Sequence, residues 1–414
     1  MLGLIVAALA WWGYGKWFSQ PAQAGSGAGG APAAGGADGV ELDQLFGGNA
    51  RIPRAADGAA RAGGERADGE RAGGERVGGD TALEAGKDPL SRDLRELLAK
   101  VRAGDAAATS RAWAAVATGR LGREHDRVVA ALAPRGETFA DRLRALGMDN
   151  SFLHSREGRT AAEAALAAAM AQSDPEALAA GTRLITLMAR GRIELADRAA
   201  RATVDKAYGE HLIRVDRWLC NPSNVAGARS YTVRSGDNLD GIARRFRREG
   251  LQVESGTIAV LNRIRNPRAL RVGQQLKIPL APVSAVLEKR SFAMMVFVGD
   301  ELLRLYWVGH GRNDHTPVTT FEVIEKQERP DWTAPDGNVY AYGHPENILG
   351  EYFIKFGHPQ YSGFGAHGTP LKETIGTMSS MGCIRMFDAD IAELFRILPR
   401  RAKVIVRATE SVRG

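Results

Sequence analysis

The sequence predicts a multidomain α+β protein in which an α-helical region, a small βααβ domain and a mainly β domain follow one another. Three changes of pattern along the 414 residues indicate this order. An Ala/Leu/Arg-rich stretch with helical periodicity covers residues 88–218, a strand–helix–helix–strand pattern covers 229–280, and strands dominate 283–407. Because a chain of this length exceeds one compact core, we expect separate domains.

Composition and charge limit the function classes. The formal net charge of +7 favours anionic partners such as wall polymers or membrane surfaces. The basic residues are dispersed among acids and form neither a Lys/Arg block nor an aromatic-interleaved basic run, so no nucleic acid is expected as a partner. The two cysteines, Cys220 and Cys383, fall in different predicted domains, which excludes a disulfide framework. With no CxxC or HExxH spacing, we expect no metal site and no cofactor. Cys220 is expected to be a small buried residue.

The first 87 residues predict export and a tether. Residues 1–19 are predicted to be a membrane anchor or a signal segment, because residues 1–15 contain no charged side chain. Aromatic residues around Trp11 and Trp17 favour an anchor at the membrane interface, whereas a small-residue pattern at Ala22 and Ala24 leaves cleavage open. Residues 20–87 form a predicted disordered linker rich in Gly, Ala and Arg, including a five-residue unit repeated in 61–80.

The region 88–218 reads as packed helical hairpins. Gly104 is expected to end its first helix. Thr160 and Glu163 fit a capping box, and Asp174 with the following proline opens another helix. Nothing in this stretch resembles an active site, so a spacer or a protein-docking module is the expected role.

The segment 229–280 predicts a domain with one small core. A short strand around Tyr231 precedes Asn238, which is a good N-cap for a helix over 239–246. A second helix contains Ile258 and Leu261, and residues 270–279 read as a turn and a closing strand.

The pieces YTVRSGDNL, IARRF, VLN and VGQQLKIP stand in the order and spacing of the LysM family, which this segment resembles over its whole length. The resemblance implies binding of N-acetylglucosamine-containing glycans such as peptidoglycan strands. The alternative is a degenerate fold that only separates domains. The loop 247–257 is longer than usual for the family. By position, the groove residues would be Gly236, Asp237, Asn238, Leu239, Ile264, Asn266 and Pro267.

The segment 283–407 contains the residues that suggest chemistry. Gly299 and Asp300 indicate a hairpin between two of its strands. Cys383 follows Gly382 in a predicted loop, and a thiol whose proton an imidazole can accept is a plausible acyl-transfer nucleophile. A glycine there also lets backbone N–H groups reach a developing oxyanion. The spacing alone leaves five histidines of this segment open as the partner: His310, His315, His344, His358 and His367.

The ordered motifs HGT, IG and SxGCIRM resemble the YkuD-type L,D-transpeptidase catalytic domain. The resemblance implies that Cys383 is the nucleophile and His367 the general base, with the ring oriented by the carbonyl of Gly368. Gly382 and Cys383 would supply oxyanion-hole N–H groups. Two further positions, Ser380 and Arg385, would support the site, and Arg385 would either brace the cysteine loop or meet a substrate carboxylate. Two positions depart from the family pattern: Met381 replaces a frequent histidine, and Thr319 replaces a glycine.

The combined resemblance implies a peptidoglycan L,D-transpeptidase that forms 3-3 crosslinks through a thioester and is targeted by its LysM module. Its partners would be glycan strands, stem peptides and, through residues 1–19, the inner membrane. The expected location is the cell envelope, outside the cytoplasm. Two alternatives remain: an L,D-carboxypeptidase, in which water resolves the thioester, and a non-catalytic peptidoglycan-binding scaffold. Attachment of a protein to peptidoglycan by the same route is a further possibility.

Overall fold

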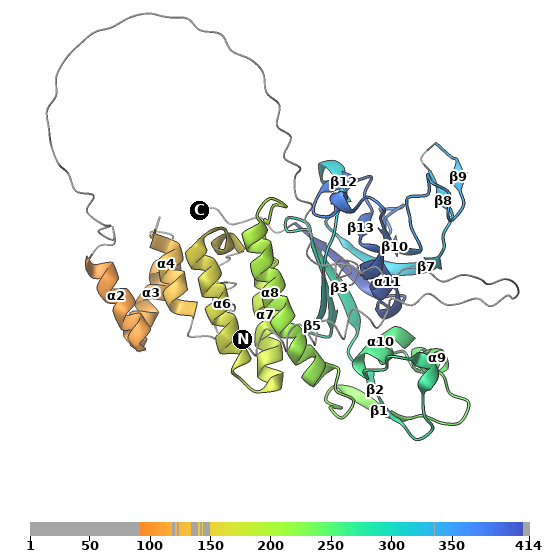
Figure 1. Cartoon of the computed structure of the whole chain (residues 1–414), viewed down its shortest axis with the longest axis horizontal. Helices are drawn as coiled ribbons and strands as arrows, with labels where there is room; N and C mark the ends of the chain where they lie inside the picture. Colours follow the sequence, from red (N-terminus) through yellow and green to blue (C-terminus); the bar gives the residue numbers. More distant parts are fainter. Residues whose placement is uncertain are drawn as a thin grey trace, which may run out of the picture.

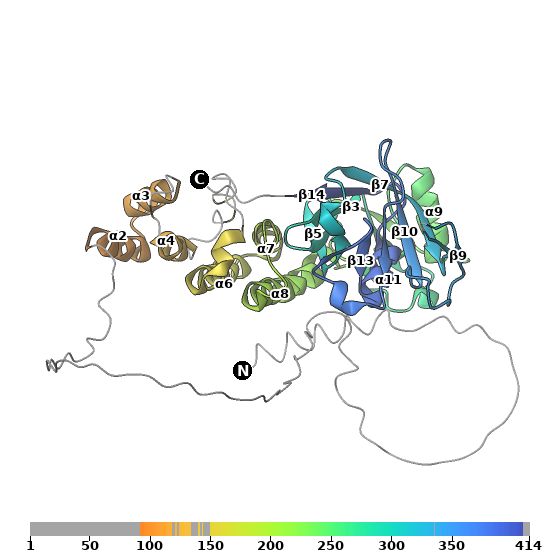
Figure 2. The same cartoon turned by 90° about the horizontal axis from the view of Figure 1, so that it is seen from above.

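The computed structural model describes residues 92–117, 121, 124–133, 140, 143, 150–334 and 336–408. A row of helices leads to a large β-sheet, and a small βααβ unit lies at one end of the assembly (Figure 1). Seen from above, the row of helices ends against strand β5 (Glu301–Trp307) of the sheet (Figure 2). The predicted mixed α+β architecture is therefore confirmed. The predicted anchor at 1–19 and the predicted linker at 20–87 lie outside the described residues.

The helical region is built from helices that neighbour one another in chain order. Gly104, with a φ of 93°, ends the first of them, as predicted. Ser155 caps α6 by accepting a hydrogen bond from the Gly158 N–H, at 2.9 Å. The predicted capping box is wrong, because Thr160 lies inside α6 and its hydroxyl donates to the Arg156 carbonyl. The elements are α2 Arg92–Ala103, α3 Ala106–Ala117, α4 His125–Leu132, η4 Asn150–His154, α6 Arg156–Met170, α7 Asp174–Met188, α8 Arg198–Arg214 and the π-helical turn η5 Val215–Leu219.

None of the described helices combines the length and the apolar composition that crossing a bilayer requires.

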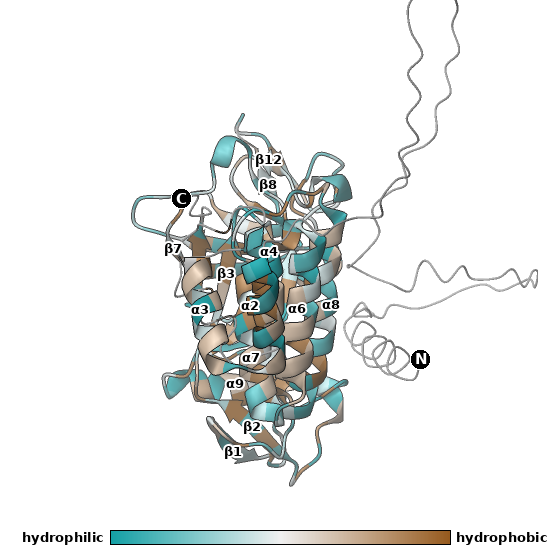
Figure 3. Cartoon of the chain, turned by 90° about the vertical axis from the view of Figure 1, so that its left-hand side faces the viewer, coloured by the Kyte–Doolittle hydropathy of each residue, from teal (hydrophilic) through white to brown (hydrophobic). Residues whose placement is uncertain are grey.

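Viewed from the helical side, the apolar strands of the large sheet lie behind these helices (Figure 3). The helices therefore act as a cover for one side of the sheet.

The βααβ unit has the predicted element order. Strands β1 (Ala228–Thr232) and β2 (Gln275–Pro279) pair antiparallel, with Tyr231 opposite Leu276. Asn238 accepts a hydrogen bond from the Gly241 N–H at 2.8 Å, which confirms it as the N-cap of α9 (Leu239–Arg248). Helix α10 (Ser255–Leu261) and the short η6 (Pro267–Ala269) complete the unit. Its buried apolar side chains form a core of their own.

The C-terminal domain is organised around an eight-stranded sheet with the order β13-β11-β10-β7-β14-β3-β4-β5. The pairs β11·β13 and β14·β3 are parallel and the other neighbours are antiparallel. Gly299, with a φ of 61°, makes the predicted tight turn between β4 and β5. The strand bounds are β3 Val283–Glu288, β4 Ala293–Val298, β7 Thr320–Glu328, β10 Tyr352–Gly357, β11 Gly365–Gly368, β13 Ile384–Met386 and β14 Lys403–Arg407.

Shorter elements surround this sheet. Helix α11 (Asp388–Ile397) packs against β10 and β11. Strand β6 (His310–Gly311) pairs with β12 (Met378–Ser380), and β8 (Trp332–Thr333) pairs with β9 (Val339–Tyr340). Two 3-10 turns, η7 Arg312–Asp314 and η8 Lys372–Thr374, lie in the connections.

Buried polar contacts join the helical region to the sheet. The ring Nε2 of His211 on α8 lies 3.0 Å from the Leu302 carbonyl oxygen, and Thr182 on α7 donates to the Glu301 carboxylate at 3.0 Å. The Trp307 indole donates to Asp205 at 2.7 Å. Apolar side chains of strands β3, β4 and β5 share one core cluster with the helices. Because paired polar groups are buried between them, the helical region and the sheet form one packed body.

The βααβ unit is attached to the same body at α11. The Thr257 hydroxyl donates to the Ile397 carbonyl at 2.6 Å, and both groups are buried. Gly256 lies against the backbone of Arg396, where a side chain on this glycine would collide. Cys220, which follows η5 at the start of the chain segment that leads into β1, is fully buried, as predicted.

Candidate active site

Two neighbouring strands of the sheet bring the predicted catalytic residues together. His367 lies on β11, and Cys383 immediately precedes β13. The strands pair in parallel with His367 opposite Arg385, so that Cys383 stands two residues from the partner of the histidine. The positive charge of Arg385 acts on the pKa of both groups, which indicates that the three side chains form one cluster.

The imidazole of His367 is buried and its orientation is fixed. Its Nδ1 lies 2.6 Å from the carbonyl oxygen of Gly368, the contact that the sequence led us to expect. Since a carbonyl oxygen can only accept, the proton sits on Nδ1 and the neutral ring keeps a lone pair on Nε2. Burial lowers the pKa of His367 to about 4, against the smaller, opposing effects of the backbone groups of Gly368 and Ile348. The ring is therefore neutral at pH 7.

The thiol of Cys383 is also neutral at pH 7. Its Sγ contacts the Gly363 carbonyl oxygen at 3.5 Å, and the residue as a whole is partly exposed. Burial of the sulfur raises its pKa to about 11, although the Gly365 N–H and the Arg385 charge both oppose this shift. No hydrogen bond joins Cys383 to His367, both of which lie in the described part of the chain. The structure therefore describes a neutral thiol and a neutral imidazole, with no ion pair between them.

A ring of hydrogen bonds fixes the loop before Cys383. The Ser380 hydroxyl donates to the Cys383 carbonyl at 2.7 Å and accepts from the Gly382 N–H at 3.1 Å. The Thr316 hydroxyl donates to the Gly382 carbonyl at 2.7 Å. Gly382 has a φ of 141°, a conformation that a side chain would strain, and Phe364 occupies the space where its Cβ would be. The loop therefore requires glycine at this position.

These contacts change the expected oxyanion hole. The N–H of Gly382, predicted to be one of its donors, is already bonded to Ser380. The N–H of Cys383 has no acceptor among the described residues. Of the two predicted donors, the Cys383 N–H therefore remains available to an acceptor, while the Gly382 N–H holds the loop.

The Arg385 guanidinium contacts the same loop, since its Nη1 lies 3.3 Å from the Ser379 hydroxyl. This contact agrees with the bracing role that we considered for Arg385. Arg312, on η7, lies close enough to lower the pKa of Arg385 by charge repulsion, after the larger effect of burial. Of these two positive side chains, Arg385 is the one whose charge acts on the Cys383 thiol.

The helical region reaches the chain that leads into this loop. Gly376, with a φ of 82°, lies against Leu195 and the guanidinium of Arg201. Arg201 stacks over the ring of Trp307 at 4.0 Å. The Gly376 N–H donates to the Val308 carbonyl at 2.9 Å, and the chain then continues directly into β12. Helix α8 thus supports the segment that precedes Ser380.

Sequence comparison identifies the family. Residues 283–406 match the family model of the L,D-transpeptidase catalytic domain, and residues 231–279 match that of the LysM domain. A putative L,D-transpeptidase, YqjB of Bacillus subtilis, is 32% identical over 124 residues, which cover 29% of this chain and 69% of the relative. The chain belongs to the L,D-transpeptidase family. A putative L,D-transpeptidase YkuD of Bacillus licheniformis is 26% identical over 189 residues, covering 42% of this chain and 97% of the relative.

Solved L,D-transpeptidase structures resemble the chain more distantly. One from Mycobacterium smegmatis is 19% identical, covering 33% of this chain and 65% of the solved chain, with a TM-score of 0.26. One from Mycobacterium tuberculosis is 17% identical, covering 33% and 63%, also with a TM-score of 0.26. The chain therefore spans less than two thirds of the length of these two solved proteins.

The predicted glycan-binding side chains of this L,D-transpeptidase serve mainly local structure. The Asp237 carboxylate accepts from the Tyr231 hydroxyl at 2.6 Å and from the Arg234 N–H at 2.8 Å. Asn238 and Asn266 cap α9 and η6, the latter beginning at Pro267. Leu239 and Ile264 are buried in one common core, and Gly236, with a φ of 84°, makes a turn. The two loops are thus close to a shared core, but their side-chain polar groups are already partnered.

Sequence reasoning missed three contributors to the L,D-transpeptidase site. Thr316 bonds both Gly382 and, through the same hydroxyl, the Gly311 N–H at 2.9 Å. Arg312 adds positive charge. The Asp388 carboxylate accepts from the Thr369 N–H and packs on Gly368, next to the carbonyl that orients His367. Only Thr316 had any signal in the sequence, since it lies three residues before Thr319, the position that departs from the family pattern. Among the described residues, no group of three or more His, Cys, Asp or Glu side chains could hold a metal ion.

Proposed function

We propose that this protein is a peptidoglycan L,D-transpeptidase in which Cys383 attacks the stem peptide, His367 carries the proton and the products are 3-3 crosslinks. The observation that best supports this proposal is the pairing of β11 with β13. It sets a histidine with a lone pair on Nε2 beside a cysteine in a rigid loop. The LysM match supports the proposal that residues 231–279 hold the glycan strand.

The first half of the reaction begins from the neutral pair. The Cys383 sulfur attacks the carbonyl carbon of the third residue of a tetrapeptide stem, while its proton passes to Nε2 of His367. Because the negative charge moves to the carbonyl oxygen, no free thiolate has to accumulate. The Cys383 N–H donates to this oxygen. When the C–N bond breaks, the imidazolium gives its proton to the leaving amine of D-alanine, and a thioester remains.

The second half reverses these roles. The side-chain amine of another stem attacks the thioester carbon and loses a proton to Nε2 of His367. Cleavage of the C–S bond returns this proton to the sulfur and leaves a 3-3 crosslink. If water attacks instead, the product is a tripeptide stem. Arg385 and Arg312 supply positive charge for the carboxylate at the end of the donor stem.

Matches to a LysM domain and to an L,D-transpeptidase domain support a location in the cell envelope, outside the cytoplasm. There, the two domains act on one polymer. The βααβ unit would hold the strand, and the catalytic domain, fixed to it through Thr257 and Ile397, would reach the stems.

The proposal is tested by incubating the full-length protein with peptidoglycan rich in tetrapeptide stems and separating the digested products by mass spectrometry. We expect crosslinked dimers with wild type and none with Cys383→Ala, whose glycan binding should be unchanged. Tripeptide monomers alone would show an L,D-carboxypeptidase. If a carbapenem adds no mass to Cys383 and no product forms, the protein is a binding scaffold.

A further inference from the structure

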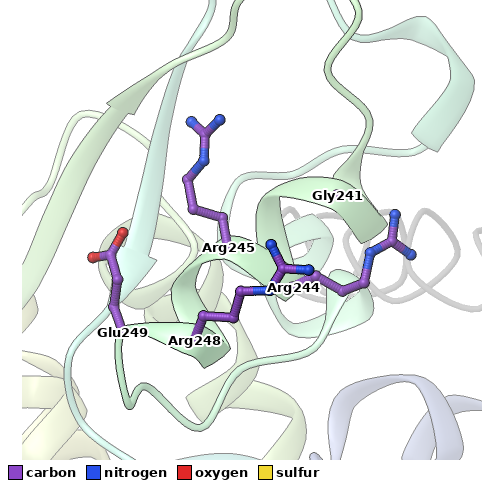
Figure 4. A pocket seen from close by; sticks show the side chains of 5 residues that line it. All are labelled: Gly241, Arg244, Arg245, Arg248 and Glu249. Carbon is purple, nitrogen blue, oxygen red and sulfur yellow. The ribbon is translucent and has the colours of Figure 1, made fainter.

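A pocket of about 480 Å³ lies along α9 of the βααβ unit, and the function proposed above does not use it. All of its lining residues belong to α9 or to the residue after it. Figure 4 shows three arginine side chains around the pocket, with that of Arg248 running along the helix toward Arg244. The lining residues are Gly241, Arg244, Arg245, Arg248 and Glu249.

Two of the three arginines in this pocket, Arg244 and Arg248, have no partner for their positive charge among the described residues. The Glu249 carboxylate is already paired with Arg229, from β1. Arg245 donates to the Tyr231 hydroxyl at 2.7 Å. Arg244 and Arg248 form no ion pair and no side-chain hydrogen bond within the described part of the chain. Two exposed guanidinium groups therefore keep all their donors for a ligand.

The arrangement is unfavourable for the helix itself. Arg244 and Arg248 are four residues apart on α9, so they lie on one face and repel each other. Arg247, which lies between them in sequence, is by contrast paired with Glu254 at 3.0 Å. The unpaired arginines thus collect on the face that forms the pocket. A planar guanidinium binds carboxylates with two parallel hydrogen bonds, so the chemistry of this face suits a ligand with several carboxylates.

The pocket begins beside one of the predicted glycan-binding loops. The Gly241 N–H, at one end of the pocket, is bonded to Asn238. At 1.5 Å per residue along a helix, Arg244 lies roughly 9 Å and Arg248 roughly 15 Å beyond Asn238. A peptide branch that extends along α9 from a glycan held at this loop would bring its terminal carboxylate to these guanidinium groups.

We propose that the pocket formed by Arg244, Arg245 and Arg248 binds the carboxylates of stem peptides on the glycan strand that the LysM domain holds. The domain then recognises strands that still have their stems, which are the substrates of the catalytic domain. This inference rests on the proposed glycan binding and is independent of the chemistry at Cys383.

The test compares the binding of full-length protein to three forms of one glycan preparation: strands with stems, strands stripped of stems, and strands whose stem carboxylates are amidated. Wild type should bind the stem-bearing strands about tenfold more tightly than either other form at low salt, and this preference should shrink as salt is added. The variant Arg244→Gln/Arg248→Gln should bind all three forms alike, with the wild-type affinity for stripped strands.

A matched control removes the same charge elsewhere. The variant Arg156→Gln/Arg198→Gln alters two exposed arginines of the helical region and should keep the wild-type preference. The proposal is overturned if the pocket variant keeps the preference or if amidation has no effect. It is also overturned if a soluble polyphosphate displaces stem-bearing strands from wild type but not from the pocket variant, while free stem peptides displace them from neither protein.

Carbapenem acylation of Cys383, measured on the same samples, reports on the catalytic proposal separately. Normal acylation with no preference for stem-bearing strands would refute only the proposal about the pocket. A retained preference for stem-bearing strands without acylation would refute only the catalytic proposal. Absence of binding to stripped strands by wild type would remove the glycan binding on which the inference depends.

Discussion

The protonation state of Cys383 gives the sharpest prediction of this structure. With a pKa of about 11, against 9.0 for an unperturbed thiol, the thiolate fraction at pH 7 falls by about two powers of ten. Iodoacetamide reacts with thiolates, so the alkylation rate of Cys383 should be roughly a hundredfold below that of a free thiol at pH 7 and should still be rising at pH 11. Cys220 is fully buried and should not react in the folded protein.

The variant His367→Gln separates the two ways of activating the thiol. Because no hydrogen bond joins the groups in this state, the substitution should leave the midpoint of alkylation unchanged. The same variant should lose carbapenem acylation by about two to four powers of ten, since that reaction needs the base. Alkylation would be followed by the mass of the Cys383 peptide between pH 5 and 11, and in both proteins the rate should rise through this whole range without reaching a plateau. A wild-type midpoint below pH 8 that rises in His367→Gln would refute our reasoning and establish a resting ion pair.

The remaining predictions concern the supports of the site. Arg201→Met removes the guanidinium against Gly376 and should slow carbapenem acylation several-fold without weakening the initial complex. Thr182→Val, at the same interface, should leave the acylation rate unchanged, and equal slowing by both variants would mean that Arg201 has a purely structural role. Ser380→Ala removes two hydrogen bonds, so it should lower the unfolding free energy by about 1–3 kcal/mol and also slow acylation. A variant as stable and as fast as wild type would contradict the described loop. Burial lowers the pKa of His211 to about 4. The stability that the neutral ring contributes is therefore complete above pH 6.5, and the free energy of unfolding should fall by about 3 kcal/mol as the pH drops from 6.5 to 4. His211→Gln, which can still donate to Leu302 but does not titrate, should flatten the acid side of a urea-unfolding series, and an unchanged slope would argue against this origin.

Several elements were predictable because their signals are local. The Asn238 cap, the turn at Gly299 and the helix end at Gly104 depend on backbone conformations that few residue types allow. The capping box at Thr160 failed because Ser155, five residues earlier, offered an equivalent cap and the helix began there. Competing caps differ by little free energy, so packing decides between them.

Contacts between distant segments were not predictable in the same way. Thr316 and Gly382 are 66 residues apart, and Thr182 and Glu301 are 119 apart. Arg385 illustrates the difference: its position in the motif was evident, but its contact with Ser379 and its closeness to Arg312 depend on how the strands pair.

By itself, the sequence determined the order of the LysM and catalytic domains and the family, and it led to the proposal of Cys383 and His367 as the reacting pair, because these depend on residue types at fixed spacings. The tertiary structure decided the protonation of that pair, the use of the Gly382 N–H within its own loop and the attachment of the helices to the sheet. Burial sets a pKa, and burial results from every segment that packs around a group, which no local pattern records.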